Sequence, residues 1–222
     1  VGLLGDAGSP TREVLIFGEM PAPLPGPGEL RIRLAASAVN YADCYRRGGQ
    51  GYDQEFPRII PNSDGAGIVD RVGDGISAGL LGKRVWLYNG QRFRAFGTAA
   101  EYISLPADLV TELPDGVDFT AGATLGIPAM TAHLAVFTAG SARDRYLLVT
   151  GGAGAVGNYA IQLAKWDGAK VIATASSAEK ARRAADAGAD LVLDYRREEL
   201  AGRIAAFTGG RGVDHIVDVD FG

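Results

Sequence analysis

The second half of the chain alternates between short apolar runs and longer stretches with helical periodicity. Residues 146–150 form a short apolar run that is typical of a strand buried on both faces of a parallel sheet. A glycine-rich turn follows, and the apolar positions of residues 156–167 then recur at the spacing of a helix. The alternation predicts further strands over 170–175, 191–193 and 213–219, and helices over 129–139, 178–187 and 198–207. This order predicts a doubly wound parallel sheet with right-handed crossovers.

The first half has a different pattern, dense in glycine and proline. In residues 29–35, Leu30, Ile32 and Leu34 fall on one face, as in a half-buried strand. Further strands are predicted over 14–17, 62–73, 82–88 and 99–105, with a turn-rich connector over 21–28 and one or two helical turns within 38–49. Short strands between glycine and proline turns predict a partly open β-barrel. Because the pattern changes near Asp118, we predict a β-rich domain over 1–117 and an α/β domain over 118–222.

The turn after residue 150 carries Gly152, Gly154 and Gly157 in the spacing G-x-G-x-x-G. The first glycine allows a tight turn, the second lets the backbone approach a pyrophosphate, and the third lets the helix pack closely on the strand. The motif alone would also suit an ordinary glycine turn, but here a second predicted strand ends at Ser176, near the position that reads the ribose. The turn therefore predicts a dinucleotide site. The residues expected to hold the phosphates are Gly152, Ala153, Gly154, Ala155 and Val156.

Composition bounds the class of protein. The chain has 222 residues, of which 47% are hydrophobic and 22% charged, as in a soluble globular protein. A net charge of −4 argues against nucleic acid or an anionic membrane as partner. The absence of a membrane-spanning apolar run and of a signal segment leads us to expect a cytoplasmic protein. Cys44 is the only cysteine, which excludes an internal disulfide and a multi-cysteine zinc site.

Five segments together resemble the medium-chain dehydrogenase/reductase superfamily, and most closely its zinc-free NADPH quinone oxidoreductases of the ζ-crystallin type. They are residues 25–29 (PGPGE), 39–43 (VNYAD), 62–67 (NSDGAG) with 72–73 (VG), 126–132 (GIPAMTA) and the glycine turn. The resemblance covers nearly the whole chain. It implies a GroES-like partly open barrel followed by a Rossmann NADP-binding domain, and a homodimer. Since family members are distinctly longer, the C-terminal part of the Rossmann domain is expected to be missing here.

The same segments separate the chain from the zinc alcohol dehydrogenases that it also resembles. The first zinc cysteine of those enzymes would fall at Asn40, and their Gly-His-Glu stands here as Asn62, Ser63 and Asp64. An amide and a hydroxyl are poor zinc ligands beside thiolate and imidazole. We therefore expect no metal site.

The residues after the second and third strands of the α/β domain bear on the choice of coenzyme. Ser176 stands where an NAD-preferring protein places Asp or Glu, and a hydroxyl can donate to a 2′-phosphate that a carboxylate would repel. Lys180 lies one helical turn further on, and relatives use a tyrosine on the adenosine side at the position of Tyr195. Alternatively, Ser176 caps the next helix and Lys180 is a solvated surface charge. Taken together, the three residues favour NADPH.

The resemblance places Asn40 and Tyr45 at the nicotinamide pocket. Asn40 would orient the coenzyme and the Tyr45 hydroxyl would donate to the carbonyl that gains charge; otherwise Tyr45 is a packed aromatic residue with a wet hydroxyl. Asp43 is expected to cap a helix. Thr131 resembles a threonine that contacts the nicotinamide; otherwise it is an ordinary helix residue. His133 stands near the nicotinamide at a position where relatives more often carry tyrosine, and it is either a general acid or a packed helix residue.

The function that this resemblance implies is zinc-independent hydride transfer from NADPH to a quinone, a small-molecule substrate. The coenzyme supplies the difficult chemistry, while the protein supplies orientation and electrostatics. Two alternatives stay open. The protein could reduce an enone, an enoyl thioester or another activated alkene as a zinc-free reductase of the alcohol dehydrogenase type. It could also bind NADPH without useful turnover.

Overall fold

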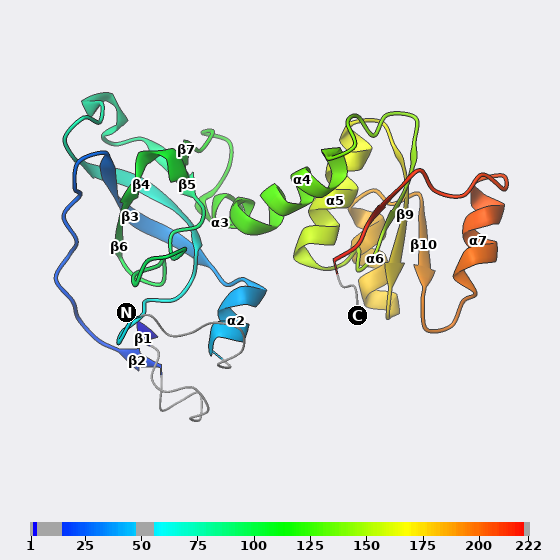
Figure 1. Ribbon diagram of the computed structural model, residues 1–222, viewed down its shortest axis with the longest axis horizontal. Coiled ribbons are helices and arrows are strands. Elements are labelled where there is room, and N and C mark those ends of the chain that lie inside the picture. Colours follow the sequence, from blue (N-terminus) through cyan, green and yellow to red (C-terminus); the bar gives the residue numbers. More distant parts are fainter. Residues whose placement is uncertain (1, 4–14, 48–55, 220–222) are drawn as a thin grey trace. The chain divides into compact units, whose positions relative to one another are not determined.

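The computed structural model describes residues 2–3, 15–47 and 56–219 of the chain. Contacts between residues divide it into two compact units, Val1–Ile127 and Pro128–Gly222 (Figure 1). No helix in the described part of the chain is long and apolar enough to cross a membrane.

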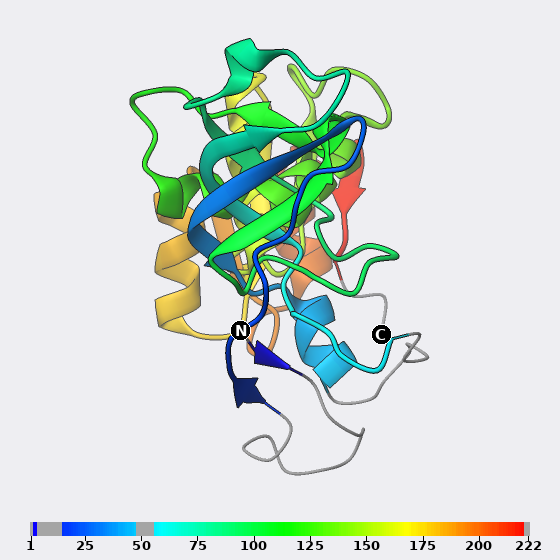
Figure 2. The same ribbon diagram turned by 90° about the vertical axis from the view of Figure 1, so that its left-hand side faces the viewer.

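The first unit is built on an antiparallel sheet of five strands (Figure 2). In spatial order they are β6 (Tyr102–Pro106), β3 (Glu29–Ala38), β4 (Asp64–Val72), β5 (Arg84–Leu87) and β7 (Val110–Glu112). The sheet encloses a core of aliphatic side chains and ends at β6 on one side and β7 on the other, without pairing of these two strands. The prediction of a partly open barrel is therefore confirmed.

The alternation read from the sequence explains the inner face of this sheet. Successive side chains of a strand point to opposite faces of the sheet, so Leu30 and Ile32 of β3 lie on the same face. There they are fully buried in one core with Val69 of β4. At Gly67 the two strands approach so closely that a Cβ atom would lie 2.2 Å from the carbonyl oxygen of Arg33. Glycine is thus required for this pairing.

Several elements of the first unit differ from the prediction. Strand β3 runs to Ala38, three residues further than predicted, because its end still pairs with the start of β4. Strand β7 was not predicted. Residue 14 of the predicted first strand, 14–17, lies outside the described residues. Of the other three residues, Ile16–Phe17 form strand β2, which pairs with β1 (Gly2–Leu3). Helix α2 (Tyr41–Arg47) supplies the expected helical turns.

Helix α3 (Phe119–Ala123) begins where the sequence pattern changes. The side chain of Asp118 caps it by accepting from the backbone N–H of Ala121 at 2.7 Å. The helix packs on β3, β4 and β5, so the structure assigns it to the first compact unit, which ends at Ile127. The change of pattern at Asp118 therefore coincides with the start of α3, whereas the first compact unit continues to Ile127.

A turn of π-helix, η3 (Leu125–Ala129), follows α3, and short 3₁₀ turns η1 (Ala78–Leu80) and η2 (Ala107–Leu109) occur earlier. Gly126 interrupts η3 with a non-helical ψ of −113°. Helix α4 (Met130–Phe137) then begins one residue later than the predicted helix and ends two residues earlier.

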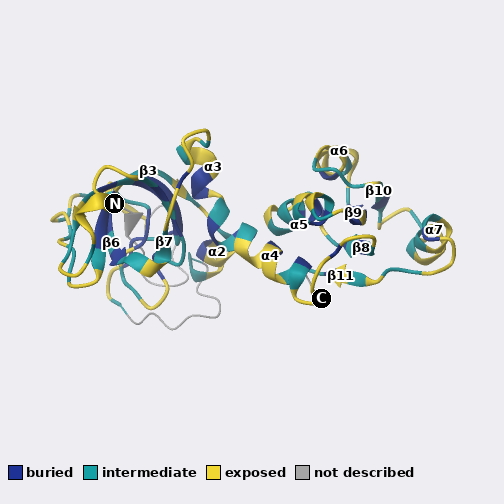
Figure 3. Cartoon of the chain, turned by 90° about the horizontal axis from the view of Figure 1, so that it is seen from above, coloured by how far each residue is buried: buried dark blue, intermediate teal, exposed yellow. Residues whose placement is uncertain are grey.

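The second unit contains a parallel sheet in the order β10 (Leu191–Asp194), β9 (Lys170–Ala175), β8 (Tyr146–Val149) and β11 (His215–Val217). Its helices are α5 (Ala155–Trp166), α6 (Ala178–Asp186) and α7 (Leu200–Phe207). Figure 3 shows α5 and α6 on one face of the sheet, and both contact β9. The chain passes from β8 outward to β9 and β10 and then returns to the other side of β8 as β11, which confirms the predicted winding.

Candidate cofactor-binding and active site

The glycine turn lies between β8 and α5, at the carboxyl end of β8, which is one of the two inner strands of the sheet. Gly151 has a positive φ of 59°, which glycine adopts without strain. The backbone N–H of Gly152 donates to the carbonyl of Thr174 at 3.0 Å, and that of Gly151 donates to the Thr174 hydroxyl at 3.2 Å. These bonds attach the turn to the neighbouring strand β9.

The three glycines of the motif meet different surroundings. A Cβ atom on Gly157 would lie 2.4 Å from the carbonyl oxygen of Gly151, and one on Gly152 would lie 2.9 Å from the Cβ of Ala173. Both positions therefore need glycine for packing. Gly154 is exposed, and its Cβ atom would have one neighbour, the Gly151 carbonyl oxygen at 3.3 Å. Only the middle glycine faces open space, as a residue that admits a ligand to the backbone must.

Helix α5 begins without a side-chain cap. Gly154 occupies the N-cap position, and the first turn, which starts with Ala155 and Val156, contains no acidic residue. The first N–H groups of a helix have no partner within the helix, and they carry the positive end of its dipole. With Ala153 half-buried and Ala155 exposed beside them, these groups can hold the pyrophosphate of a dinucleotide.

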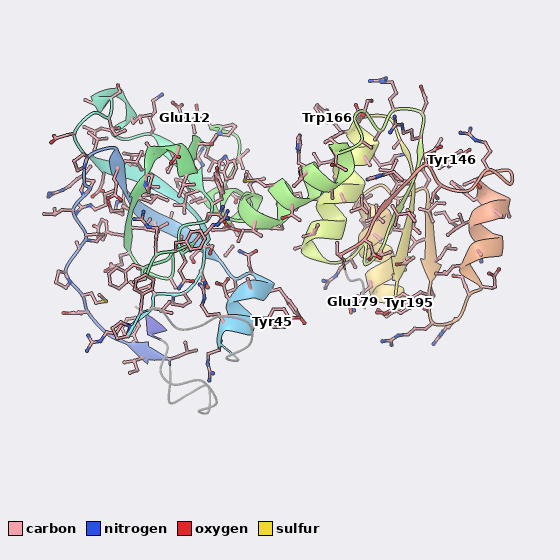
Figure 4. The ribbon with its side chains drawn as sticks, in the orientation of Figure 1. Tyr45, Glu112, Tyr146, Trp166, Glu179 and Tyr195 are labelled. Atoms are coloured by element: carbon pink, nitrogen blue, oxygen red, sulfur yellow. The ribbon has the colours of Figure 1, made fainter. Side chains whose placement is uncertain are left out.

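The neighbouring strands bring the predicted ribose-reading residues together. Ser176 follows β9 and Tyr195 follows β10, and the backbone N–H of Tyr195 donates to the carbonyl of Ala175 at 3.3 Å. Tyr195 extends from the end of β10 into solvent (Figure 4). The Lys180 ammonium, on the first turn of α6, donates to the Ser176 hydroxyl at 3.2 Å. A cation, a hydroxyl and a phenol thus lie at one edge of the sheet.

The alternative interpretation of Ser176 as a helix cap is wrong. The N-cap of α6 is Ser177, whose hydroxyl accepts from the backbone N–H of Lys180 at 3.3 Å. The Ser176 hydroxyl, by contrast, faces the Lys180 side chain. The capping function and the predicted phosphate contact therefore belong to different serines.

The first unit holds a second group of polar residues, centred on Asp64. This residue begins β4 and is fully buried. Its Oδ2 atom accepts from the side-chain amide of Asn40 at 2.8 Å and from the backbone N–H of Ile127 at 2.7 Å, whereas its Oδ1 atom is buried without a hydrogen-bond partner among the described residues. Sequence reasoning noted Asp64 only as a departure from a zinc motif. A carboxylate directly before the Gly-Ala-Gly of a buried strand was the signal that could have identified it.

Burial raises the pKa of Asp64 to about 6. The hydrogen bonds from Ile127 and Asn40 lower the pKa and offset part of this rise, while the negative charge of Asp43 adds to it. Asp64 is therefore ionised above neutral pH but at a cost in stability, since a buried charge loses its hydration.

Asp43 caps helix α2, as predicted. Its Oδ2 atom accepts from the backbone N–H of Asn40 at 2.7 Å, which is the reciprocal bond of a capping box. Burial raises the pKa of Asp43, against the effect of its hydrogen bonds and of the Arg46 charge. Tyr45 projects from the same helix (Figure 4), where its ring meets Tyr41 edge-to-face at 4.6 Å. Both tyrosines are exposed, and the role of Tyr45 toward the coenzyme remains a prediction.

Thr131 and His133 lie on α4, in the second unit, and both are exposed. The His133 ring lies 4.8 Å from the ring of Phe137, one helical turn away. Their roles toward a nicotinamide remain predictions.

The residues at the zinc-ligand positions of the alcohol dehydrogenases do not fit zinc. The Asn40 amide is already bonded to Asp64, and Ser63 offers a hydroxyl where a tetrahedral zinc site takes imidazole. The part of the chain that the structure describes contains no group of three or more His, Cys, Asp or Glu side chains placed to hold a metal ion.

Comparison with known proteins gives the family. Residues 26–115 match the family described as "Alcohol dehydrogenase GroES-like domain", and residues 155–219 match "Zinc-binding dehydrogenase". Quinone oxidoreductase of Rattus norvegicus is 35% identical over 93% of this chain and 62% of its own length. A quinone oxidoreductase structure from Escherichia coli complexed with NADPH is 30% identical, with a TM-score of 0.82 over 96% of this chain and 63% of that one. An NAD-dependent alcohol dehydrogenase structure is 32% identical, with a TM-score of 0.87 over 98% of this chain and 69% of that one.

The fold and these matches define a chain of two parts, a GroES-like unit followed by a Rossmann unit. The chain belongs to the medium-chain dehydrogenase/reductase superfamily and is quinone oxidoreductase-like within it. It spans about 62% of the length of the curated quinone oxidoreductases that it matches.

Proposed function

We propose that the protein is a zinc-independent oxidoreductase that uses NADPH to reduce a quinone, a small-molecule substrate. NADPH, when bound, supplies the hydride. The observation that carries the coenzyme choice is the edge formed by Ser176, Lys180 and Tyr195, which has a cation and two hydroxyl groups where an NAD site has a carboxylate. The coenzymes named for two similar structures differ, NADPH in one and NAD in the other. The coenzyme preference proposed for this chain therefore rests on its own residues.

The proposed roles follow the geometry of each group. The backbone N–H groups from Gly154 to Val156 hold the pyrophosphate at the start of α5, and the Lys180–Ser176 pair holds the 2′-phosphate. From the resemblance to the family, we propose that Asn40 orients the coenzyme and that Tyr45, an exposed residue, donates its hydroxyl to the quinone oxygen that gains negative charge.

The test is an acceptor screen on the whole protein with NADPH and with NADH. We expect 1,4-benzoquinone or a naphthoquinone to be reduced faster than enones such as cyclohexenone, and NADPH to be preferred. Faster turnover of the enones would favour the alkene reductase instead. Tight NADPH binding with no oxidation by any acceptor would favour a non-catalytic binding protein. We also propose a homodimer, which light scattering on the same sample would test.

A further inference from the structure

The first unit contains a cavity that the proposed function does not use. Its volume is about 930 Å³, within the range of sites that bind small molecules. It is lined by residues 17–23 of the connector before β3, by the loop of residues 93–96, and by residues 100–104 at strand β6. The described residues around it all belong to the first unit, so no residue of the second unit is needed to form it.

Hydrogen bonds hold the connector and the loop in place. The Arg31 guanidinium donates to the Pro23 carbonyl at 3.1 Å, which attaches the connector to β3. The backbone N–H of Ile60 donates to the Ala95 carbonyl at 2.9 Å, and that of Gly97 donates to the Ile60 carbonyl at 2.8 Å. The walls of the cavity are therefore formed before a ligand enters, as is usual for small-molecule sites.

Three exposed phenylalanines line this cavity. The exposed fractions of Phe17, Phe93 and Phe96 are 94%, 78% and 45%, and exposed apolar side chains that gather at one place indicate a binding site. Phe93 also has a positive φ of 57°, a conformation that a bulky residue adopts only at a cost and that is concentrated at functional sites. The Arg92 guanidinium lies 5.2 Å from the centroid of the Phe93 ring and helps to hold it.

Arg94 places hydrogen-bond donors in the wall of the cavity. Its Nη2 atom donates to Glu29 Oε1 at 3.3 Å and to the Ser104 carbonyl. Glu29 also accepts from the Ser104 hydroxyl at 3.0 Å, so the guanidinium is fixed. No residue that the structure describes accepts from Nε or Nη1 of Arg94, and its side chain is 29% exposed. These N–H groups can therefore donate to a ligand.

The charges around the cavity favour a neutral ligand. Three carboxylates, those of Glu19, Glu29 and Glu101, stand there beside the two guanidinium groups of Arg92 and Arg94. An anion would meet this excess of negative charge, whereas a carbonyl oxygen accepts a hydrogen bond without carrying a full charge. The phenylalanines favour a planar ring system, because aromatic rings pack on one another in offset or edge-to-face geometry.

We infer that this cavity is a second small-molecule site, which binds a neutral aromatic compound bearing a carbonyl group. The rings of the ligand lie against Phe17, Phe93 and Phe96, and its carbonyl oxygen accepts from Arg94. The site is distinct from the turn before α5 that holds the coenzyme. The inference does not rest on the proposed function, because binding requires neither NADPH nor turnover.

The test uses the fluorescent ketone 6-propionyl-2-dimethylaminonaphthalene, a neutral probe whose emission shifts to shorter wavelength in apolar surroundings. The matched probe is 2-dimethylaminonaphthalene, which lacks the carbonyl and whose affinity is measured by displacement of the ketone. Titrations on the whole protein compare the wild type with Phe93→Ala and Arg94→Met. The control is Tyr41→Ala, because Tyr41 is 74% exposed but does not line the cavity. Each titration is repeated with saturating NADP⁺.

The wild type should bind the ketone with and without NADP⁺, and on the order of tenfold more tightly than the matched probe, as for a hydrogen bond to a charged group. Arg94→Met should lose this preference. Phe93→Ala should weaken both probes on the order of fivefold, as the loss of an aromatic contact does, and Tyr41→Ala should weaken neither.

Every other outcome counts against the inference. If the ketone does not bind, or if Phe93→Ala and Tyr41→Ala weaken it equally, the cavity is not its site. Displacement by NADP⁺ would place the ketone at the coenzyme site, and a preference retained in Arg94→Met would show that the carbonyl is not recognised there. If Arg94→Met does not fold, the wild type and Phe93→Ala carry the test: equal affinity of the wild type for the two probes, or unchanged affinity in Phe93→Ala, overturns the inference.

Discussion

The substitution Asp64→Asn should change how the stability of the first unit depends on pH. Asp64 has a pKa of about 6 in the folded protein, against 3.8 for an exposed aspartate, chiefly because it is buried. The folded protein therefore binds this proton more tightly than the unfolded chain does. The contribution of Asp64 to the free energy of unfolding is greatest below pH 3.8. It falls between about pH 4 and 6 and is constant above that range.

The size of the effect follows from the two pKa values. A rise from 3.8 to about 6 corresponds to roughly 3 kcal/mol at about 1.36 kcal/mol per pKa unit. Asparagine does not titrate, so the variant should lack this fall. The difference in unfolding free energy, wild type minus Asp64→Asn, should decrease by roughly 2–2.5 kcal/mol between pH 4 and pH 7, because part of the total is already lost at pH 4.

The assay is urea denaturation followed by tryptophan fluorescence. The chain has two tryptophans, Trp86 on β5 of the first unit and Trp166 at the end of α5 in the second. A Trp166→Phe background leaves Trp86 as a reporter of the unit that contains Asp64. Separate signals are needed because two compact units need not unfold in one step.

Glu29→Gln is the matched control in the same unit. Burial would raise the pKa of Glu29, but hydrogen bonds from Gly26, Ser104 and Arg94 and the charge of Arg94 lower it. Stability from Glu29 is therefore present at neutral pH and is lost as the pH falls, so its difference should change in the opposite direction. If the difference in unfolding free energy between the wild type and Asp64→Asn stays constant from pH 4 to pH 7, burial does not raise the pKa of Asp64 and the reasoning is refuted.

Four further outcomes are expected. Lys180→Ala should weaken NADPH roughly tenfold or more, as charge-assisted phosphate contacts do, and leave NADH nearly unchanged; Arg182→Ala is the control, and equal losses for both coenzymes in calorimetry would contradict the 2′-phosphate assignment. Gly157→Ala should lower the unfolding free energy of the second unit by about 1–3 kcal/mol because its Cβ atom meets the Gly151 carbonyl. Gly154→Ala should fold normally but bind adenosine 2′,5′-bisphosphate and NADPH more weakly; unchanged affinity would argue against a ligand at this turn. Elemental analysis of protein purified without chelators should find zinc well below one per chain, and stoichiometric zinc needed for activity would overturn the zinc-independent proposal.

Features with local signals could be predicted from the sequence. The strand–glycine turn–helix of residues 146–167 has an apolar run, a glycine spacing and a helical period in direct succession, and the structure has all three. Strand β7, by contrast, has three residues of which two are exposed, so it carries no period. It forms because it pairs with β5, which is a contact of the tertiary structure and leaves no local pattern in the sequence.

In the candidate site, too, some features have a local sequence signal and others depend on the tertiary structure. Ser176 and Ser177 are equivalent as sequence, and only the backbone at the start of α6 decides that the second one caps the helix. The bond from Asn40 to Asp64 joins residues 24 positions apart, and the bond from Ile127 to Asp64 joins residues 63 apart. No local pattern could reveal that these motifs share one carboxylate, because their contact depends on the pairing of β3 with β4 and on the packing of α3 against both.

The central position of β9 has a consequence for how the glycine turn moves. Five consecutive residues of this strand, 171–175, are buried, and β8 and β10 pair with it on either side. Its amides should therefore be among the slowest in the second unit to exchange with deuterium. Gly151 and Gly152 both donate to Thr174 of that strand, so opening the turn requires breaking bonds to a slowly opening element. The coenzyme then meets a turn already in its binding shape, and little of the binding free energy is lost to ordering the backbone.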